Sequence, residues 1–194
     1  MDIMDLLSGQ LDSDKVLKQL SKTTGADSSQ VQQLIKLGVP TLLKSIGKNA
    51  STEEGASALA KALDNHKDDK VDDIEDFLKN VNTEEGSKIL SHVLGGNKQK
   101  VQSNLAKQTG LGDNQVSDIM SQLAPMLLGT LGKQKTSSNV DSSGLAGMLT
   151  GILGSQSLKD NNIMDSVSKL LDADGDGNIA DDVGKMLGGF FKKN

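Results

Sequence analysis

Residues 16–48 read VLKQLSKTTGADSSQVQQLIKLGVPTLLKSIGK, and residues 101–133 read VQSNLAKQTGLGDNQVSDIMSQLAPMLLGTLGK. The two stretches align without a gap at a separation of roughly 85 residues, which is too long for a solenoid repeat and fits a duplicated unit. The identical pairs are mostly apolar residues, glycine or proline, so the repeat informs about fold rather than chemistry. They are Val16/Val101, Leu20/Leu105, Lys22/Lys107, Thr24/Thr109, Gly25/Gly110, Gln30/Gln115, Val31/Val116, Pro40/Pro125, Leu42/Leu127, Leu43/Leu128, Gly47/Gly132 and Lys48/Lys133.

Within each stretch the apolar residues follow the period of an amphipathic helix. Val16, Leu17 and Leu20 share one helical face, and a glycine follows as a helix stop. The same period then continues to Pro40 and resumes behind it. Because proline removes a backbone hydrogen bond, the pattern predicts a kinked helix or a pair of helices ending at Gly47, with the equivalent interruption in the second stretch.

The composition of the chain favours an all-α fold made of many short helices. The 194 residues include three Phe, no Trp and no Tyr, so the core consists of aliphatic residues that suit helix–helix packing. The glycines outnumber the prolines by 21 to 2, which indicates helices separated by glycine stops. The duplication predicts two small bundle-like helical units in residues 1–97 and 98–194. The absence of cysteine excludes disulfides and thiolate chemistry.

Further segments mark helix starts and connections. The sequence TEEG occurs at residues 52–55 and again at residues 83–86, and each copy places a threonine cap before two acids in a positive first turn. Residues 133–140 are polar and serine-rich, which predicts a flexible connection. A last amphipathic helix is expected to carry Val183, Met186, Leu187, Phe190 and Phe191.

Residues 172–179 read DADGDGNI, which is the register of an EF-hand loop, and helices are predicted on both sides. Carboxylates occupy loop positions 1, 3 and 5, and glycine occupies position 6. Val183 stands at position 12, where an EF-hand has a bidentate glutamate, so the affinity is expected to be weak. We predict a Ca²⁺ site whose ligands are Asp172, Asp174, Asp176, the Asn178 carbonyl and Asp182. The alternative is an Asp/Gly turn whose acids cap the next helix.

A similar run, DNHKDDKVDDIE at residues 64–75, occupies the corresponding place in the first half. Three acids and Val71 fall at the EF-hand positions, but His66 replaces the second carboxylate and Asp69 replaces the glycine. Two lysines within the run would also repel a cation. We interpret this degenerate acidic loop as a solvated charged loop.

His66 and His92 are the only histidines. A metal or acid–base site built from both rings is conceivable if their loops meet, because imidazole serves both purposes. We favour helix-end or buried hydrogen-bonding roles for them. The sequence contains no nucleophile–base spacing and no phosphate-binding glycine loop, so the protein is predicted not to be an enzyme.

Residues 58–66, 86–95 and 172–187 together resemble the YidB-like family of bacterial domains of unknown function. The most specific pieces are the Ile-Leu-x-His-Val-Leu-Gly string within residues 89–95 and the Asp-x-Asp-Gly-Asp-Gly run at residues 172–177. The resemblance covers most of the chain. It implies a small helical fold, similar in some relatives to a homeodomain, and it implies no assigned activity.

These features predict a non-enzymatic helical binding or scaffold protein with a C-terminal Ca²⁺-binding loop and a protein partner of unknown identity. The alternative is a homeodomain-like nucleic-acid-binding module. The net charge of -5, the absence of arginine and the few lysine clusters argue against a nucleic-acid partner. Those clusters are Lys98/Lys100/Lys107 and Lys133/Lys135.

The expected location is the cytoplasm. The first residues are acidic where a signal peptide would be basic, and no apolar run is long enough to span a bilayer.

Overall fold

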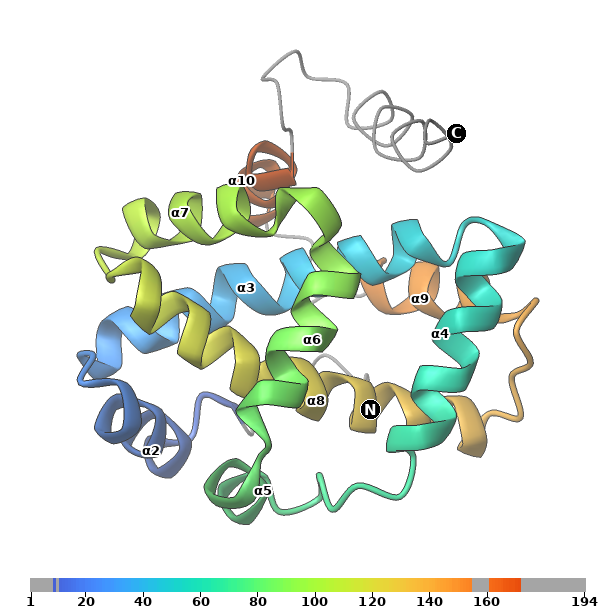
Figure 1. The fold of residues 1–194 in the computed structure, drawn as a ribbon, viewed down its shortest axis with the longest axis horizontal. Helices are drawn as coiled ribbons and strands as arrows, with labels where there is room; N and C mark the ends of the chain where they lie inside the picture. The colour runs from blue at the N-terminus through green and yellow to red at the C-terminus, as the bar shows by residue number, and fades with distance from the viewer. Residues whose placement is uncertain (1–8, 10, 155–160, 172–194) are drawn as a thin grey trace, which may run out of the picture.

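The computed structural model describes residue 9 and residues 11–154 and 161–171, and every regular element within these ranges is helical (Figure 1). In chain order the elements are α2 (Asp14–Thr24), α3 (Ser28–Asn49), α4 (Glu53–His66), α5 (Ile74–Asn80), α6 (Thr83–Leu94), the short η1 (Gly95–Asn97), α7 (Lys98–Thr109), α8 (Asp113–Ser137), α9 (Leu145–Leu153) and α10 (Asn161–Leu171). The all-α class is therefore confirmed for the described residues. None of the helices in this part of the chain has the length and apolar character needed to cross a membrane.

Helix α8 lies at the centre of the structure. Residues 119–129 are all buried, and none of them carries a charge. Helices α4, α6 and α7 pack against α8, as do α2, α3 and α5, and α6 passes across it in Figure 1. A helical segment that is uncharged on all sides is stable in water only when other helices surround it. The composition of residues 119–129 therefore explains the central place of α8.

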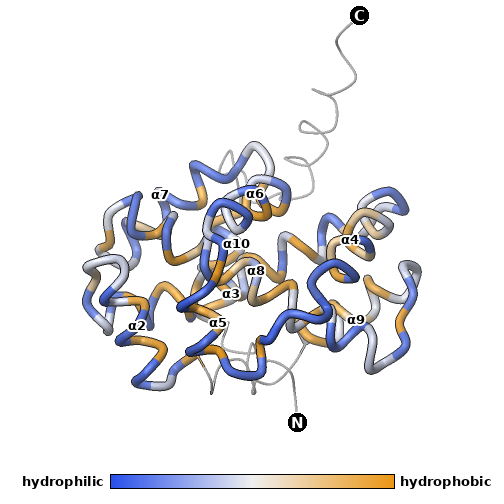
Figure 2. The backbone as a smooth tube through the Cα atoms, turned by 60° about the horizontal axis from the view of Figure 1, so that its bottom comes forward, coloured by the Kyte–Doolittle hydropathy of each residue, from blue (hydrophilic) through white to orange (hydrophobic). Residues whose placement is uncertain are grey.

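Helix α3 is the second long helix of the core. Figure 2 shows hydrophobic residues along α3 and α8, and hydrophilic residues on the outer surfaces and on the segment between α4 and α5. Leucines such as Leu34 of α3 and Leu105 of α7 are fully buried, and residues from both halves of the chain belong to one hydrophobic cluster. The division of the chain after residue 97 stays a prediction about sequence organisation.

Both prolines lie inside continuous helices rather than between pairs of helices. Pro40 lies within α3, which runs past the predicted end at Gly47 to Asn49. Pro125 lies within α8, which has 25 residues and includes most of the segment predicted to be a flexible connection. Of the two predicted alternatives, a single helix rather than a pair of helices is therefore correct for both stretches. Packing on both sides of each proline outweighs the loss of one backbone hydrogen bond.

Helix α6 crosses α8 where Pro125 interrupts its hydrogen bonding. Because Pro125 has no N–H, the carbonyl of Ser121 four residues earlier has no intrahelical donor. Gly86 of α6 lies directly on this carbonyl, and a Cβ at residue 86 would overlap the oxygen. The hydrogen that glycine carries in that direction points at the oxygen, which is the geometry of a Cα–H···O contact. The proline and the glycine together therefore permit a very close helix crossing.

The two repeated stretches form corresponding pairs of elements, α2–α3 and α7–α8. Gly25 and Gly110 each end the first helix of a pair in the left-handed conformation, with φ of 68° and 71°. The aligned glutamines then connect the pairs reciprocally. Gln30 Nε2 donates to the Gly110 carbonyl (2.8 Å), and Gln115 Nε2 donates to the Thr24 carbonyl (3.1 Å). Each pair therefore satisfies a helix-end carbonyl of the other.

We expect Gly86→Ala to lower the free energy of unfolding by about 2–3 kcal/mol, because the added methyl group must displace the backbone of α8. Urea unfolding followed by far-UV circular dichroism measures the change. Gly147→Ala on α9 is the matched control, since nothing lies within 4 Å of a Cβ added there. The control should be neutral or stabilising by up to about 1 kcal/mol, because alanine has the higher helix propensity. Equal effects of the two substitutions would contradict the close crossing.

Candidate functional site

The predicted Ca²⁺ ligands lie outside the described residues. Asp172, Asp174, Asp176, Asn178 and Asp182 all follow the end of α10, and their geometry stays a prediction. The helix that leads into the predicted loop is part of the packed structure. Three apolar residues in its second half are buried, and α10 packs against α3 and α7; the buried residues are Val167, Leu170 and Leu171. The residues directly before the predicted ligands are therefore helical and packed against the core.

The degenerate acidic run at residues 64–75 folds back onto the last turns of α8. Asp64 accepts a hydrogen bond from Lys135 Nζ (2.7 Å), and Asp72 accepts one from Lys133 Nζ (2.5 Å). Val71 is buried with its side chain over Gly129 of α8. The interpretation of the run as a solvated loop is therefore wrong for Val71, because the missing side chain of the glycine leaves a site that an apolar residue fills.

The carboxylates of this run are directed to different partners. Glu75 pairs with Lys79 (3.0 Å) and Lys15 (3.6 Å), and the hydrogen bond from Lys79 holds the pKa of Glu75 below its ordinary value. Asp73 caps α5 by accepting from the Asp76 backbone N–H. Across the ranges that the structure describes, no three His, Asp or Glu side chains are grouped so that they could hold a metal ion. In this arrangement the carboxylates of the run hold neighbouring helices together through ion pairs and one helix cap.

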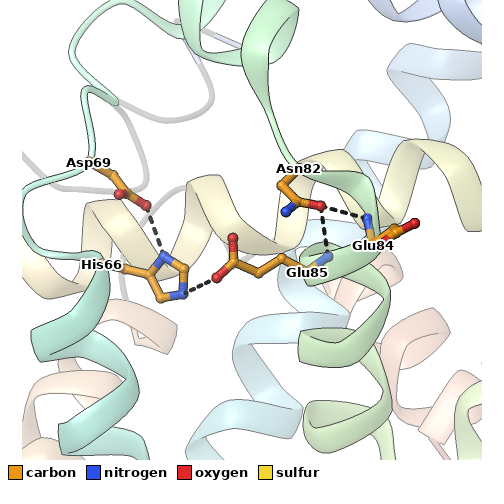
Figure 3. A network of polar contacts seen from close by, with 5 residues as sticks. All are labelled: His66, Asp69, Asn82, Glu84 and Glu85. Carbon is orange, nitrogen blue, oxygen red and sulfur yellow. Dashed lines mark hydrogen bonds and ion pairs between the residues drawn. The ribbon is translucent and has the colours of Figure 1, made fainter.

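His66, the last residue of α4, is a buried residue at the centre of a network of polar contacts (Figure 3). Its Nδ1 lies 2.8 Å from Asp69 Oδ2, so the ring donates to that carboxylate. Its Nε2 lies 3.9 Å from Glu85 Oε1, at the start of α6, and forms an ion pair there when the ring is protonated. The residue is only 9% exposed. His66 therefore links the end of α4, the acidic run and α6 in one place.

The position of Glu85 in this network follows from the cap of α6. Asn82 Oδ1 accepts hydrogen bonds from the backbone N–H groups of Glu84 and Glu85, both at 3.1 Å (Figure 3). The cap is thus one residue earlier than the predicted Thr83, which is the first helical residue. At the related start of α4 the predicted cap is correct, because Thr52 accepts from the Gly55 N–H. An asparagine directly before TEEG is the sequence signal that identifies the better cap.

His92 lies apart from His66 in a different environment. Its Nδ1 lies 2.9 Å from the Lys88 carbonyl one turn earlier in α6, and the residue is exposed. The two rings therefore do not form a joint site. The favoured role is confirmed for His66, whose ring is a buried hydrogen-bonding group at a helix end, whereas His92 is an exposed residue whose ring contacts a carbonyl of its own helix.

A family model described as "Bacterial protein of unknown function (DUF937)" matches residues 5–134. The chain therefore belongs to this family. No curated protein and no solved structure matches the chain. The narrower resemblance to YidB-like proteins stays a prediction. The matched range includes the acidic run and the His66 network and ends within α8, before α10 and the predicted Ca²⁺ loop. The match thus covers helices α2 to α7 and most of α8.

We expect His66→Ala to lower the free energy of unfolding by about 2 kcal/mol, because it leaves a cavity and removes the partner of two carboxylates. His92→Ala is the control, and its effect should stay within about 0.5 kcal/mol, as is usual for an exposed position. Thermal unfolding of both variants beside the parent protein measures the difference. A larger loss for His92→Ala would show that the network does not tie α4 to α6.

The two lysines at the end of α8 should differ in their contributions. The Lys135 side chain is 13% exposed and that of Lys133 is 33% exposed. We expect Lys135→Ala to cost about 1–2 kcal/mol, because it removes buried methylene groups as well as an ion pair, and Lys133→Ala to cost at most about 0.5 kcal/mol. Urea unfolding at low and high salt tests this. The reverse order would contradict the arrangement of the acidic run.

Proposed function

We propose that this member of the DUF937 family is a non-enzymatic helical binding or scaffold protein of the cytoplasm whose C-terminal loop binds Ca²⁺. The proposal of a non-enzymatic scaffold rests on the polar contacts of His66. A catalytic base needs a ring nitrogen that faces a reacting group. Both nitrogens of His66 face carboxylates of the protein itself, Asp69 and Glu85. This arrangement supports a role for His66 in connecting helices.

The lysine contacts favour a scaffold over a homeodomain-like nucleic-acid-binding module. Lys133 and Lys135 are one of the two basic clusters in the sequence, and each is paired with an aspartate of the acidic run. Lys98 of the other cluster donates to the hydroxyl groups of Ser87 and Ser91, at 3.1 and 3.0 Å. Nucleic-acid affinity depends on lysines and arginines that are available to phosphates. These contacts reduce that availability on a chain that already has a net charge of -5.

The proposal also includes an origin of the scaffold by duplication of one helical unit. The reciprocal hydrogen bonds of Gln30 and Gln115 support it, because two aligned side chains make corresponding contacts in opposite directions. The aligned glycines give further support. Gly47 lies against Leu153 of α9, and Gly132 lies against the backbone of α4 at Leu63, so each admits a neighbouring helix.

The Ca²⁺ part of the proposal is supported by the position of α10 directly before the acids in the sequence. An EF-hand loop follows directly on an entering helix, and its first ligand stands at the end of that helix. Helix α10 includes Leu171, the residue before Asp172, so a helix leads up to the first predicted ligand. Closely spaced carboxylates repel one another without a metal, and a divalent ion converts the repulsion into coordination. Ca²⁺ is preferred to Mg²⁺ because it accepts an irregular, oxygen-rich shell.

We expect the full chain to bind Ca²⁺ with a dissociation constant on the order of 10⁻⁵ M or weaker, and Mg²⁺ more weakly still, because position 12 lacks its bidentate glutamate. Isothermal titration calorimetry with each ion measures this. Asp174→Ala should abolish the heat of Ca²⁺ binding. Asp68→Ala, an exposed acid in the degenerate run, is the matched control and should leave it unchanged.

Two results would overturn the Ca²⁺ part. One is a parent protein that gives neither heat nor a rise in melting temperature with millimolar Ca²⁺. The other is Asp68→Ala abolishing binding while Asp174→Ala retains it, which would place the site at residues 64–75.

A further inference from the structure

We propose that Lys44 of α3 is a site of acylation, at which the neutral side-chain amine takes the acyl group of an acyl phosphate or a thioester. In this reaction the protein is the acceptor and not the catalyst. The inference is independent of the scaffold function and of the Ca²⁺ loop.

The first observation is the place of Lys44 between two packed helices. Helix α3 packs against α10, and Lys44 Nζ donates to the Ser168 hydroxyl of α10 at 2.7 Å. The lysine is partly buried, and its neighbours along α3, Leu43 and Ser45, are buried. Val167, next to Ser168 in α10, is buried as well. The contact between the helices therefore removes part of the hydration of the ammonium group.

The second observation is that this charge is poorly compensated within the described part of the chain. No ion pair joins Lys44 to a carboxylate of those residues, whereas Lys133 and Lys135 each pair with an aspartate. Its hydrogen bond there is to the neutral hydroxyl of Ser168. A partly desolvated cation with so few partners is unfavourable, which favours the neutral amine. In agreement with this, burial lowers the pKa of Lys44 below its ordinary value.

Lys98 shows that partial burial alone does not produce such a group. It is also partly buried and has no ion pair with a carboxylate of the described residues. Its Nζ, however, donates to the Ser87 carbonyl (3.2 Å), the Ser87 hydroxyl (3.1 Å) and the Ser91 hydroxyl (3.0 Å). An ammonium group has three N–H donors, so each of them has an acceptor and the charged form is stabilised. Lys98 should therefore be acylated more slowly than Lys44.

The reaction needs a neutral amine and an activated acyl carbon. The ammonium group of Lys44 first gives one proton to water. The lone pair of Nζ then attacks the acyl carbon, and the bond from that carbon to the phosphate oxygen or the thioester sulfur breaks. Phosphate or thiolate leaves with the bonding electron pair, and Nζ gives a second proton to water. The product is a neutral amide whose remaining N–H is still a donor for the Ser168 hydroxyl, so acylation removes the poorly compensated charge and is compatible with the contact.

Competitive acylation of the full chain under native conditions tests the assignment. The protein is treated with limiting acetyl phosphate or acetyl-coenzyme A at about pH 7.5. The remaining amines are acetylated with an isotopically heavy reagent after unfolding, and mass spectrometry of peptides gives the extent at each lysine. We expect Lys44 to react about threefold to tenfold faster than Lys36, an exposed lysine of the same helix, and also faster than Lys98. In urea-unfolded protein the three rates should agree within about twofold, because burial no longer distinguishes the lysines.

The pH dependence of the reaction separates basicity from access. The ratio of the Lys44 rate to the Lys36 rate should fall to one or below as the pH rises to about 10.5, where ordinary lysines also lose their protons. A ratio that is independent of pH would reflect access of the reagent alone and would overturn the proposal.

Two variants at Ser168 test the role of the missing counter-charge. Ser168→Asp supplies a carboxylate where Lys44 now meets a hydroxyl, so it should slow acylation of Lys44 by about threefold to tenfold near neutral pH. Ser168→Asn has nearly the same size without the charge and is the matched control. The Lys36 rate should be the same in both variants. Equal Lys44 rates in the two variants would contradict the proposal.

The remaining outcomes decide the site and the source of the acyl group. Faster reaction of Lys44 with either reagent supports the site and identifies the acyl donor as a phosphate or a thioester. A Lys44 rate near neutral pH that is equal to or below that of Lys36 with both reagents overturns it. A Lys44 rate that rises steeply in urea below the unfolding transition also overturns it, because the reaction would then require a locally opened form rather than the packed helices.

Discussion

The burial of residues 119–129 of α8 on all sides constrains the rest of the structure. The core of this chain contains no Trp and no Tyr, so its helices must come close together to exclude water with aliphatic side chains alone. Three glycines make this approach possible. Gly86 lets α6 lie on the backbone of α8, and Gly129 and Gly132 let Val71 and the end of α4 approach it. Pro125 contributes by freeing the Ser121 carbonyl at the crossing.

The polar chemistry of the described part is arranged around the same helix. Where α8 leaves the core, Lys133 and Lys135 extend toward Asp72 and Asp64. His66 completes the connection on the side of α6. A run of acids that resembles a cation-binding loop therefore neutralises lysines of its own chain. This arrangement needs both termini of the run to be held, which the packing of α4 and α5 against α8 provides.

The C-terminal part of the chain has a different relation to the core. Helix α10 packs on α3 and α7. It lies outside the residues that the family model matches. In our proposal the metal-binding loop follows α10, whereas the acidic run at residues 64–75 binds lysines of the helical scaffold. Lys44 of α3 donates a hydrogen bond to the Ser168 hydroxyl of α10, so a polar contact joins α10 to the part of the chain that the family model matches.

The sequence by itself determined the helical class, the glycine stops at Gly25 and Gly110 and the cap at Thr52, because backbone freedom and local hydrogen bonds decide these features. It also gave Gln30 and Gln115 as one of the identical pairs of the repeat, without indicating their contacts. Only the tertiary structure decided that α3 and α8 continue through their prolines, that Val71 is buried and that Glu85 faces His66. These outcomes depend on which helix lies opposite, and the energy of packing between residues distant in the chain outweighs the local preference of any one of them.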